Sequence, residues 1–183
     1  MTSPCRHWLL ACVWRLAPLW LALAAPLGAH AAEEDELKAA IIYKLLMFVD
    51  WPADALPAMN GTLALCLQPD SRYAEALKVL AEQPVRGLRL ELRTTPPAEP
   101  AGACNAILLD DGGPAALSAI TRRLKTASVL LIADGADIAS EGLVFSVRRV
   151  DKKVLFDLNL ASARRARLQV SSKLMRLARG VIE

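Results

Sequence analysis

Short apolar runs alternate with helix-like segments along most of this chain, and this alternation restricts the fold more than any other feature. The pattern predicts strands over residues 62–67, 88–92, 106–109, 128–132, 143–147 and 154–158. Helices are predicted over residues 38–49, 71–82 and 171–178, with others beginning at residues 114 and 161. The chain is therefore predicted to form one three-layer α/β domain. Helices flank a mostly parallel sheet with an antiparallel C-terminal hairpin at one edge.

The segment KAAIIYKLLMFVDWP, residues 38–52, is apolar on nearly every side of the helix that it predicts. Its clear solvent seekers are Lys38, Lys44 and Asp50. The run is too short and too charged to span a membrane, which needs about 20 apolar residues. The helix must therefore be buried, either by its own domain or by a partner. For the second case, the candidate partner interface on this segment consists of Ile42, Leu46 and Trp51.

The N-terminal residues have the pattern of a secretory signal. Two arginines are followed by LAPLWLALAAPLGA and then by the small-x-small sequence that ends at Ala31. We expect export to the periplasm, cleavage after Ala31, and a single domain over residues 32–183. Acidic residues at 33–36 are expected to precede the first helix and to complement its N-terminal dipole.

Two other interpretations of the N-terminus stay open. Cys12 lies in a lipoprotein-like sequence, although almost no hydrophobic segment precedes it. An uncleaved membrane anchor is the second alternative, and Pro18, Pro26 and the cleavage-like sequence argue against it.

Composition removes most enzyme classes. The segment after Ala31 has 20 Lys and Arg against 19 Asp and Glu, and both histidines of the chain precede its first residue. Nucleophile–histidine catalysis and the usual zinc sites therefore lack their imidazole, and no phosphate-binding glycine motif is present. We expect no catalytic residues, metal or cofactor, and the near-neutral charge does not favour nucleic-acid binding.

Two cysteines follow the leader, Cys66 and Cys104, each beside a strand-like apolar run. In an exported chain they form a disulfide if the two strands are neighbours in the sheet. Two buried free thiols are the alternative. If the bridge forms, it is either a structural staple or a redox switch.

Three acids lie at or just past the ends of predicted strands, namely Asp110, Asp111 and Asp134. Ligands bind at the carboxyl ends of strands in open α/β sheets, and paired carboxylates also suit a hard cation. These positions are a candidate ligand pocket. The alternative is that DDGG and ADGAD are turns built from residues that turns prefer.

The C-terminal segment is basic. Its predicted helix carries an apolar stripe of Leu174, Leu177, Ala178 and Val181, which would leave the arginines on the outer face. Arg164, Arg165 and Arg176 are candidates for contact with an acidic partner or an anionic lipid. A solvated face is the alternative.

Several segments together resemble the YfiR-type periplasmic proteins, in the same order over essentially the whole chain after the leader. They are KAAIIYKLLMFVDWP, Cys66 in LALCLQ, Cys104 in ACNAILLDD, Phe-x-x-Asn over 156–159 and Ser-Ser-x-Leu-x-x-x-Ala over 171–178. The resemblance implies a non-enzymatic regulator that represses an inner-membrane diguanylate cyclase by binding its periplasmic sensor region. Lower cyclic di-GMP and less biofilm would follow.

The resemblance also implies further partners and the cysteine pairing. An outer-membrane lipoprotein would sequester the repressor, a homodimer is expected, and Cys66 pairs with Cys104. Some members have a second cysteine pair near the hairpin, whereas this chain has Phe145 and no cysteine there. The alternative function is a small-molecule-binding sensor that uses the candidate pocket at Asp110 and Asp134.

Overall fold

The fold was analysed in a computed structural model, which describes residues 27–55, 60–94, 104–124 and 127–183. Most of the expected signal, including Cys12, lies outside these residues. Contacts divide the chain into two units, residues 1–32 and 33–183, and only the second is described at length below. No helix among the described residues is long and apolar enough to cross a membrane.

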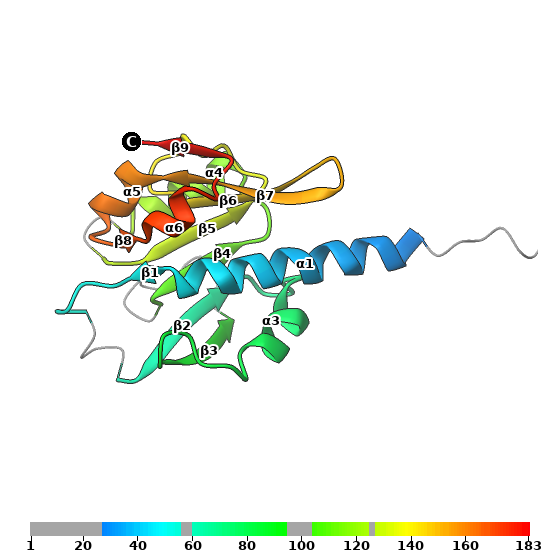
Figure 1. The fold of residues 1–183 in the computed structure, drawn as a ribbon, viewed down its shortest axis with the longest axis horizontal. Coiled ribbons are helices and arrows are strands. Elements are labelled where there is room, and N and C mark those ends of the chain that lie inside the picture. The colour runs from blue at the N-terminus through cyan, green and yellow to red at the C-terminus, as the bar shows by residue number, and fades with distance from the viewer. Residues whose placement is uncertain (1–26, 56–59, 95–103, 125–126) are drawn as a thin grey trace, which may run out of the picture. The chain divides into compact units, whose positions relative to one another are not determined.

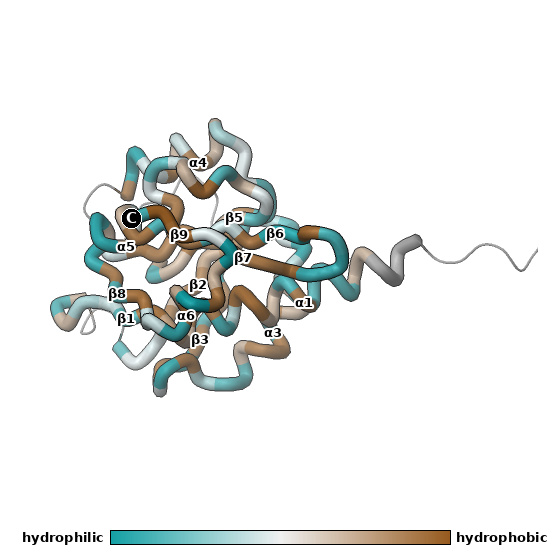
Figure 2. The backbone as a smooth tube through the Cα atoms, turned by 45° about the horizontal axis from the view of Figure 1, so that its top comes forward, coloured by the Kyte–Doolittle hydropathy of each residue, from teal (hydrophilic) through white to brown (hydrophobic). Residues whose placement is uncertain are grey.

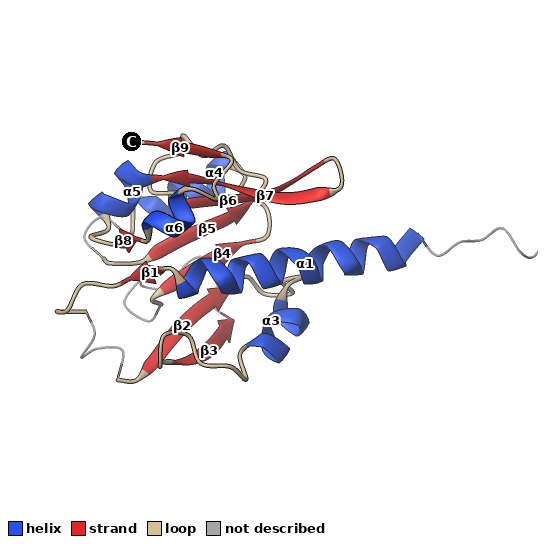
Figure 3. Cartoon of the chain, viewed as in Figure 1, coloured by secondary structure: helices blue, strands red, loops and turns tan. Residues whose placement is uncertain are grey.

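A mixed sheet forms the centre of the second unit (Figures 1 and 3). Its order in the described chain is β3-β2-β4-β5-β6-β7-β9. The strands are β2 Thr62–Leu67, β3 Arg89–Thr94, β4 Ala106–Leu109, β5 Leu130–Asp134, β6 Phe145–Val150, β7 Lys153–Asn159 and β9 Gly180–Ile182. Neighbours from β3 to β6 are parallel, β7 is antiparallel to β6, and β9 is parallel to β7. The mostly parallel sheet with an antiparallel hairpin is therefore confirmed.

Helices and a small second sheet complete the unit. The helices are α1 Leu27–Met47, α3 Ala74–Leu80, α4 Pro114–Thr121, α5 Leu160–Arg165 and α6 Ser172–Met175. The second sheet pairs β1 Val49–Asp50 with β8 Gln169–Val170 in antiparallel register. The chain leaving α1 is thus tied to a segment more than a hundred residues later.

Both faces of the sheet are covered, as the packing of alternate residues along β5 shows. Ile132 packs in the same cluster as Ile42 of α1, whereas its neighbours Leu131 and Ala133 pack with Leu117 of α4. Because successive strand residues point to opposite faces, α1 and α4 lie on opposite sides of the sheet. Burial on both faces explains why β5 reads as a continuous apolar run. Figure 2 shows the contrast with the β6–β7 hairpin, whose tip is mostly hydrophilic.

Helix α1 is apolar because it belongs to the core. Ile42 and Leu46 are completely buried, and Trp51 is 8% exposed with its indole Nε1 donating to the Asn105 carbonyl at 3.2 Å. The expectation that these three residues offer a partner interface is therefore corrected: sheet side chains of the same chain already cover them. The acidic residues 33–36 are also corrected, because they lie inside α1 rather than before it.

The C-terminal helix predicted over 171–178 is present but shorter than predicted. Helix α6 ends at Met175, and the chain then forms β9, which takes the sheet edge beside β7. The Arg179 guanidinium holds β9 to β7 by donating two hydrogen bonds to the Asp157 carboxylate, at 2.9 and 2.6 Å. Pairing with β7 and with the buried Asp157 carboxylate is more favourable here than continuing the helix along its apolar stripe. Because β9 covers β7, the β6–β7 hairpin does not lie at the edge of the described sheet.

The structure joins Cys66 to Cys104 by a disulfide that links β2 to the start of β4. The two strands are parallel neighbours, and both cysteines are buried. The pairing implied by the resemblance is thus present.

Candidate functional site

Three parallel strands, β2, β4 and β5, end at the same edge of the sheet, where the predicted acids lie. Asp110 follows β4 and accepts hydrogen bonds from the Ser71 hydroxyl and the Arg72 backbone N–H, both at 2.7 Å. Its own backbone N–H donates to the Gln68 side-chain oxygen at 2.7 Å. Asp110 therefore ties the end of β4 to the turn that follows β2.

Asp134 is the last residue of β5, and side chains from two other elements reach it. Lys38 of α1 donates from Nζ to Asp134 Oδ2 at 2.9 Å, and the Tyr73 hydroxyl donates to the same oxygen at 2.5 Å. Asp134 is 9% exposed and Lys38 is 6% exposed. The expectation that Lys38 seeks solvent is corrected, because its ammonium is the partner of a buried carboxylate.

The network continues along α1 to the hairpin. Lys38 Nζ also lies 2.8 Å from Glu34 Oε1, one helical turn earlier. The other oxygen of Glu34 accepts from Arg149 of β6 at 2.5 Å. We call Glu34, Lys38, Tyr73, Asp134 and Arg149 the strand-end network. It connects α1, the turn before α3, the sheet and the hairpin through charged hydrogen bonds.

The pKa values within the network favour fixed charges over proton transfer. Hydrogen bonds from Lys38 and Arg149 hold the pKa of Glu34 below its ordinary value. Burial alone lowers the pKa of Lys38, but hydrogen bonds to Glu34 and Asp134 outweigh it, so the pKa is raised. Burial, followed by the hydrogen bond to Asp134, raises the pKa of Tyr73. The lysine thus stays cationic and the phenol stays protonated, which suits neither a nucleophile nor a general base.

The DDGG segment contains one exposed acid and a tight backbone contact. Asp111 is exposed, whereas Gly112 packs where a Cβ would lie 2.2 Å from the Cβ of Ala136. The backbone N–H of Gly112 also donates to the Asp134 carbonyl at 3.2 Å. Position 112 requires glycine because the two loops approach each other too closely for a side chain.

The three predicted acids therefore differ in what they do. Asp110 and Asp134 are brought to one edge and bridged by Arg72, which hydrogen-bonds the Asp110 carbonyl and lies 3.5 Å from Asp134 Oδ2. A ligand at this edge would have to displace Ser71, Tyr73 or Lys38. Among the described residues, no group of three metal-ligating side chains is suitably placed for an ion.

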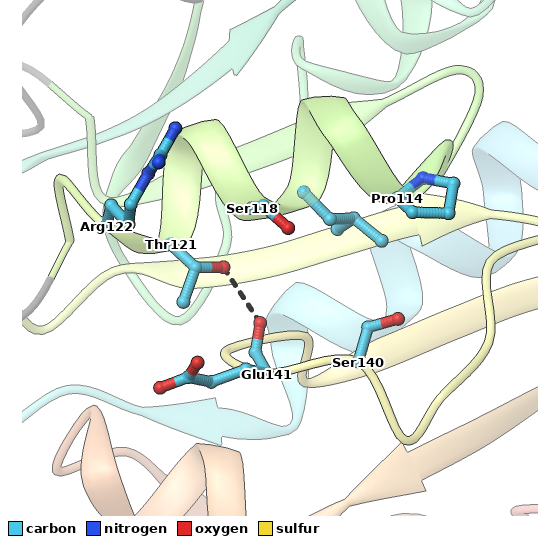
Figure 4. A pocket seen from close by; sticks show the side chains of 7 residues that line it. Pro114, Ser118, Thr121, Arg122, Ser140 and Glu141 are labelled. Carbon is cyan, nitrogen blue, oxygen red and sulfur yellow. Dashed lines mark hydrogen bonds between the residues drawn. The ribbon is translucent and has the colours of Figure 1, made fainter.

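A separate hollow lies between α4 and the loop that precedes β6 (Figure 4). It encloses about 370 Å³ and is lined by Pro114, Leu117, Ser118, Thr121, Arg122, Ser140 and Glu141. The Thr121 hydroxyl donates to the Glu141 carbonyl at 2.8 Å and so holds the two walls together. None of the predicted pocket acids lines this hollow.

The predicted basic residues differ in their pairing. Arg164 and Arg165 are exposed at the end of α5, and Arg165 donates to the Ser162 hydroxyl at 2.9 Å. Arg176, just past α6, is exposed and has no carboxylate partner among the described residues. Arg179 and Arg167, by contrast, pair with Asp157 and Asp54. Some basic side chains are thus free to meet another molecule.

Sequence reasoning missed Lys38, Tyr73 and Glu34 as members of a network. One signal was available, since Lys38 is one of the few charged residues in the apolar segment over residues 38–49. Its partner Asp134 lies 96 residues away, and no local pattern connects the two.

The structure is thus an α/β domain whose strand-end acids Asp110 and Asp134 are paired internally, and some of whose C-terminal cations are exposed. The chain belongs to the YfiR/HmsC-like family, whose model matches residues 35–179. Members of this family are periplasmic and regulatory rather than catalytic. No curated protein matches the chain significantly.

Proposed function

We propose that this protein is a non-enzymatic periplasmic repressor. It binds the periplasmic sensor region of an inner-membrane diguanylate cyclase and lowers the activity of that enzyme. Less cyclic di-GMP and less biofilm follow. The observation that carries the proposal is the family match over residues 35–179, which covers nearly the whole second unit.

The structure supports this proposal through what the charged groups do. The strand-end acids hold the fold together, and exposed cations such as Arg164 and Arg176 remain available to an acidic partner surface. We further propose a homodimer and sequestration by an outer-membrane lipoprotein as the means of releasing the cyclase.

The decisive experiment measures intracellular cyclic di-GMP in a deletion strain. We expect a rise that is corrected by the full chain and not by a copy that begins at Ala32. Correction by the copy without the leader would contradict a periplasmic site of action. No rise, in a strain where the cyclase is independently shown to be active, would contradict repression itself.

Maturation has its own test, because α1 runs through the expected cleavage position. Cleavage after Ala31 would place Glu33 and Glu34 in the first turn of the remaining helix, where negative charge is favourable. Mass spectrometry of the exported protein should give Ala32 as its first residue. A mass that includes the leader would favour an uncleaved anchor.

A small-molecule sensor is the second candidate, and the hollow beside α4 is the observation that favours it. Its volume is in the range of small-ligand sites, and it combines Leu117 with hydroxyls and charges of both signs. A metabolite that raises the melting temperature of the wild-type protein, and not of a Ser118→Trp variant, would support this role.

A further inference from the structure

The exposed apolar residues near the C-terminus fall within a stretch of six residues. Leu177 is 68% exposed, Val181 is 40% exposed and Ile182 is 37% exposed. Val181 is the register partner of Leu158 on β7, and Leu158 belongs to the same core cluster as Leu174 of α6. Register partners share a face of the sheet, so Val181 lies on the face that α6 covers.

Strand β9 is also an edge. In the described sheet its one neighbour is β7, so its other side presents backbone N–H and C=O groups that no strand pairs. The strand is nevertheless held firmly. The Arg179 backbone N–H donates to the Phe156 carbonyl at 2.9 Å, and its guanidinium binds Asp157, which is 2% exposed. An edge that is fixed in advance loses little entropy when another strand joins it.

Some basic side chains beside this edge form no ion pairs with the described residues. The side chains of Lys173 and Arg176 are exposed and have no carboxylate partner among the described residues. They lie three residues apart across the end of α6, so both occupy one side of that turn. We call Lys173, Arg176, Leu177 and Val181 the C-terminal strip.

We propose that the C-terminal strip binds an extended segment of the partner protein, apolar with acidic residues, which joins β9 as a further strand. The proposal rests on the repressor function and names the contact by which it acts. Backbone groups of β9 pair with the incoming backbone, apolar side chains cover Leu177 and Val181, and carboxylates meet Lys173 and Arg176.

Two other occupants fit the strip less well. A lipid surface satisfies cations and apolar side chains but offers no peptide groups to the strand edge. A second copy of this chain offers peptide groups, but it would bring the Lys173 and Arg176 of each copy together, and like charges in contact are unfavourable. A peptide segment of opposite charge satisfies all three features.

A binding measurement with defined probes tests the contact directly. The probes are a peptide of about eight alternating Val and Glu residues, its Val and Lys counterpart, and phosphatidylglycerol vesicles. We expect the exported protein to bind the acidic peptide with at least about tenfold preference over the basic one. Equal binding of the two peptides, or binding of vesicles alone, would overturn the proposal, as would a concentration-dependent dimer that the Arg176→Glu, Leu177→Ser variant abolishes.

The chain offers a matched control for the strip. Lys78 and Val79 are an adjacent exposed basic and apolar pair on α3, and Val79 is 68% exposed, the same as Leu177. The Arg176→Glu, Leu177→Ser variant is expected to weaken acidic-peptide binding by about tenfold, whereas Lys78→Glu, Val79→Ser leaves it within about twofold. Equal losses in both variants would overturn the proposal.

Repression in the cell separates this inference from the function on which it rests. The wild-type chain and the Lys78→Glu, Val79→Ser variant should lower cyclic di-GMP, whereas the Arg176→Glu, Leu177→Ser variant should not. This result would support both the repressor function and the strip as its contact. If all three lower it equally, the strip is not the contact although the repressor function survives. If the wild-type chain itself fails, the proposed function fails, and the peptide measurement still decides whether the strip binds.

Discussion

The strand-end network and the C-terminal strip use the same kinds of residue in opposite ways. At the strand ends, Lys38 and Asp134 satisfy each other in the interior. In the strip, Lys173 and Arg176 are exposed, and no carboxylate of the described residues pairs with them. A charge that is paired and buried maintains the fold, whereas one that is left open is available to another molecule. Sequence alone had offered both regions as candidate binding sites, a ligand pocket at the acids and a partner contact at the basic residues.

The largest effect is expected when the network is broken at Lys38. A Lys38→Ala variant should lower the free energy of unfolding by about 3–5 kcal/mol, because the buried Asp134 carboxylate loses its nearest cation. Lys44→Ala, at an exposed position on the same helix, should change it by less than about 0.5 kcal/mol. Urea unfolding measures both. Equal losses would mean that Asp134 is not maintained by Lys38.

The disulfide joins β2 to the start of β4, and β4 lies beside the strand that carries Asp134. Replacing Cys66 and Cys104 by serine should lower the free energy of unfolding by about 2–4 kcal/mol. Binding at the strip should be unchanged, since β9 and β2 are far apart in the strand order. Wild-type protein in reductant is the control and should lose the same stability. A loss of peptide binding with the fold retained would indicate a redox switch that couples the two regions.

Within the C-terminal region, paired and open charges can be compared directly. Asp157→Asn should cost about 2–3 kcal/mol of unfolding free energy, because charged hydrogen bonds to Arg179 are lost from a buried position. It should also loosen β9 and weaken peptide binding. Asp111→Asn, at an exposed acid, should change neither quantity. Retained stability in Asp157→Asn would show that β9 is held by its backbone pairing alone.

The smallest effect concerns acid pH. The folded pKa of Glu34 lies below its unfolded value of 4.5, so its stabilising contribution is present above pH 4.5 and is lost as pH falls through the folded pKa. The stability of the wild-type protein should therefore fall more steeply below pH 4.5 than that of Glu34→Gln. Unfolding curves at neutral and acid pH measure the difference. Parallel pH profiles would contradict the ion pairs of Glu34 with Lys38 and Arg149.

Local patterns predicted the elements that depend on local chemistry. Strands 62–67 and 106–109 match β2 and β4 to the residue, since each is a short apolar run bounded by turn residues. Helix 71–82 was too long by a few residues at both ends, and strand 128–132 lies two residues later, over β5. The strand shift arises because register with the neighbouring strands β4 and β6 decides the boundary of β5.

The amino-acid sequence by itself determined the layered α/β class and the burial of the first helix. These follow from residue type and spacing, which are local quantities. Only the tertiary structure decided that Lys38 is buried against Asp134, that residues 180–182 form an edge strand, and which arginines stay open. Each of these depends on a partner many residues away, and the free energy of burying a charge or pairing a strand exists only when both partners are in place.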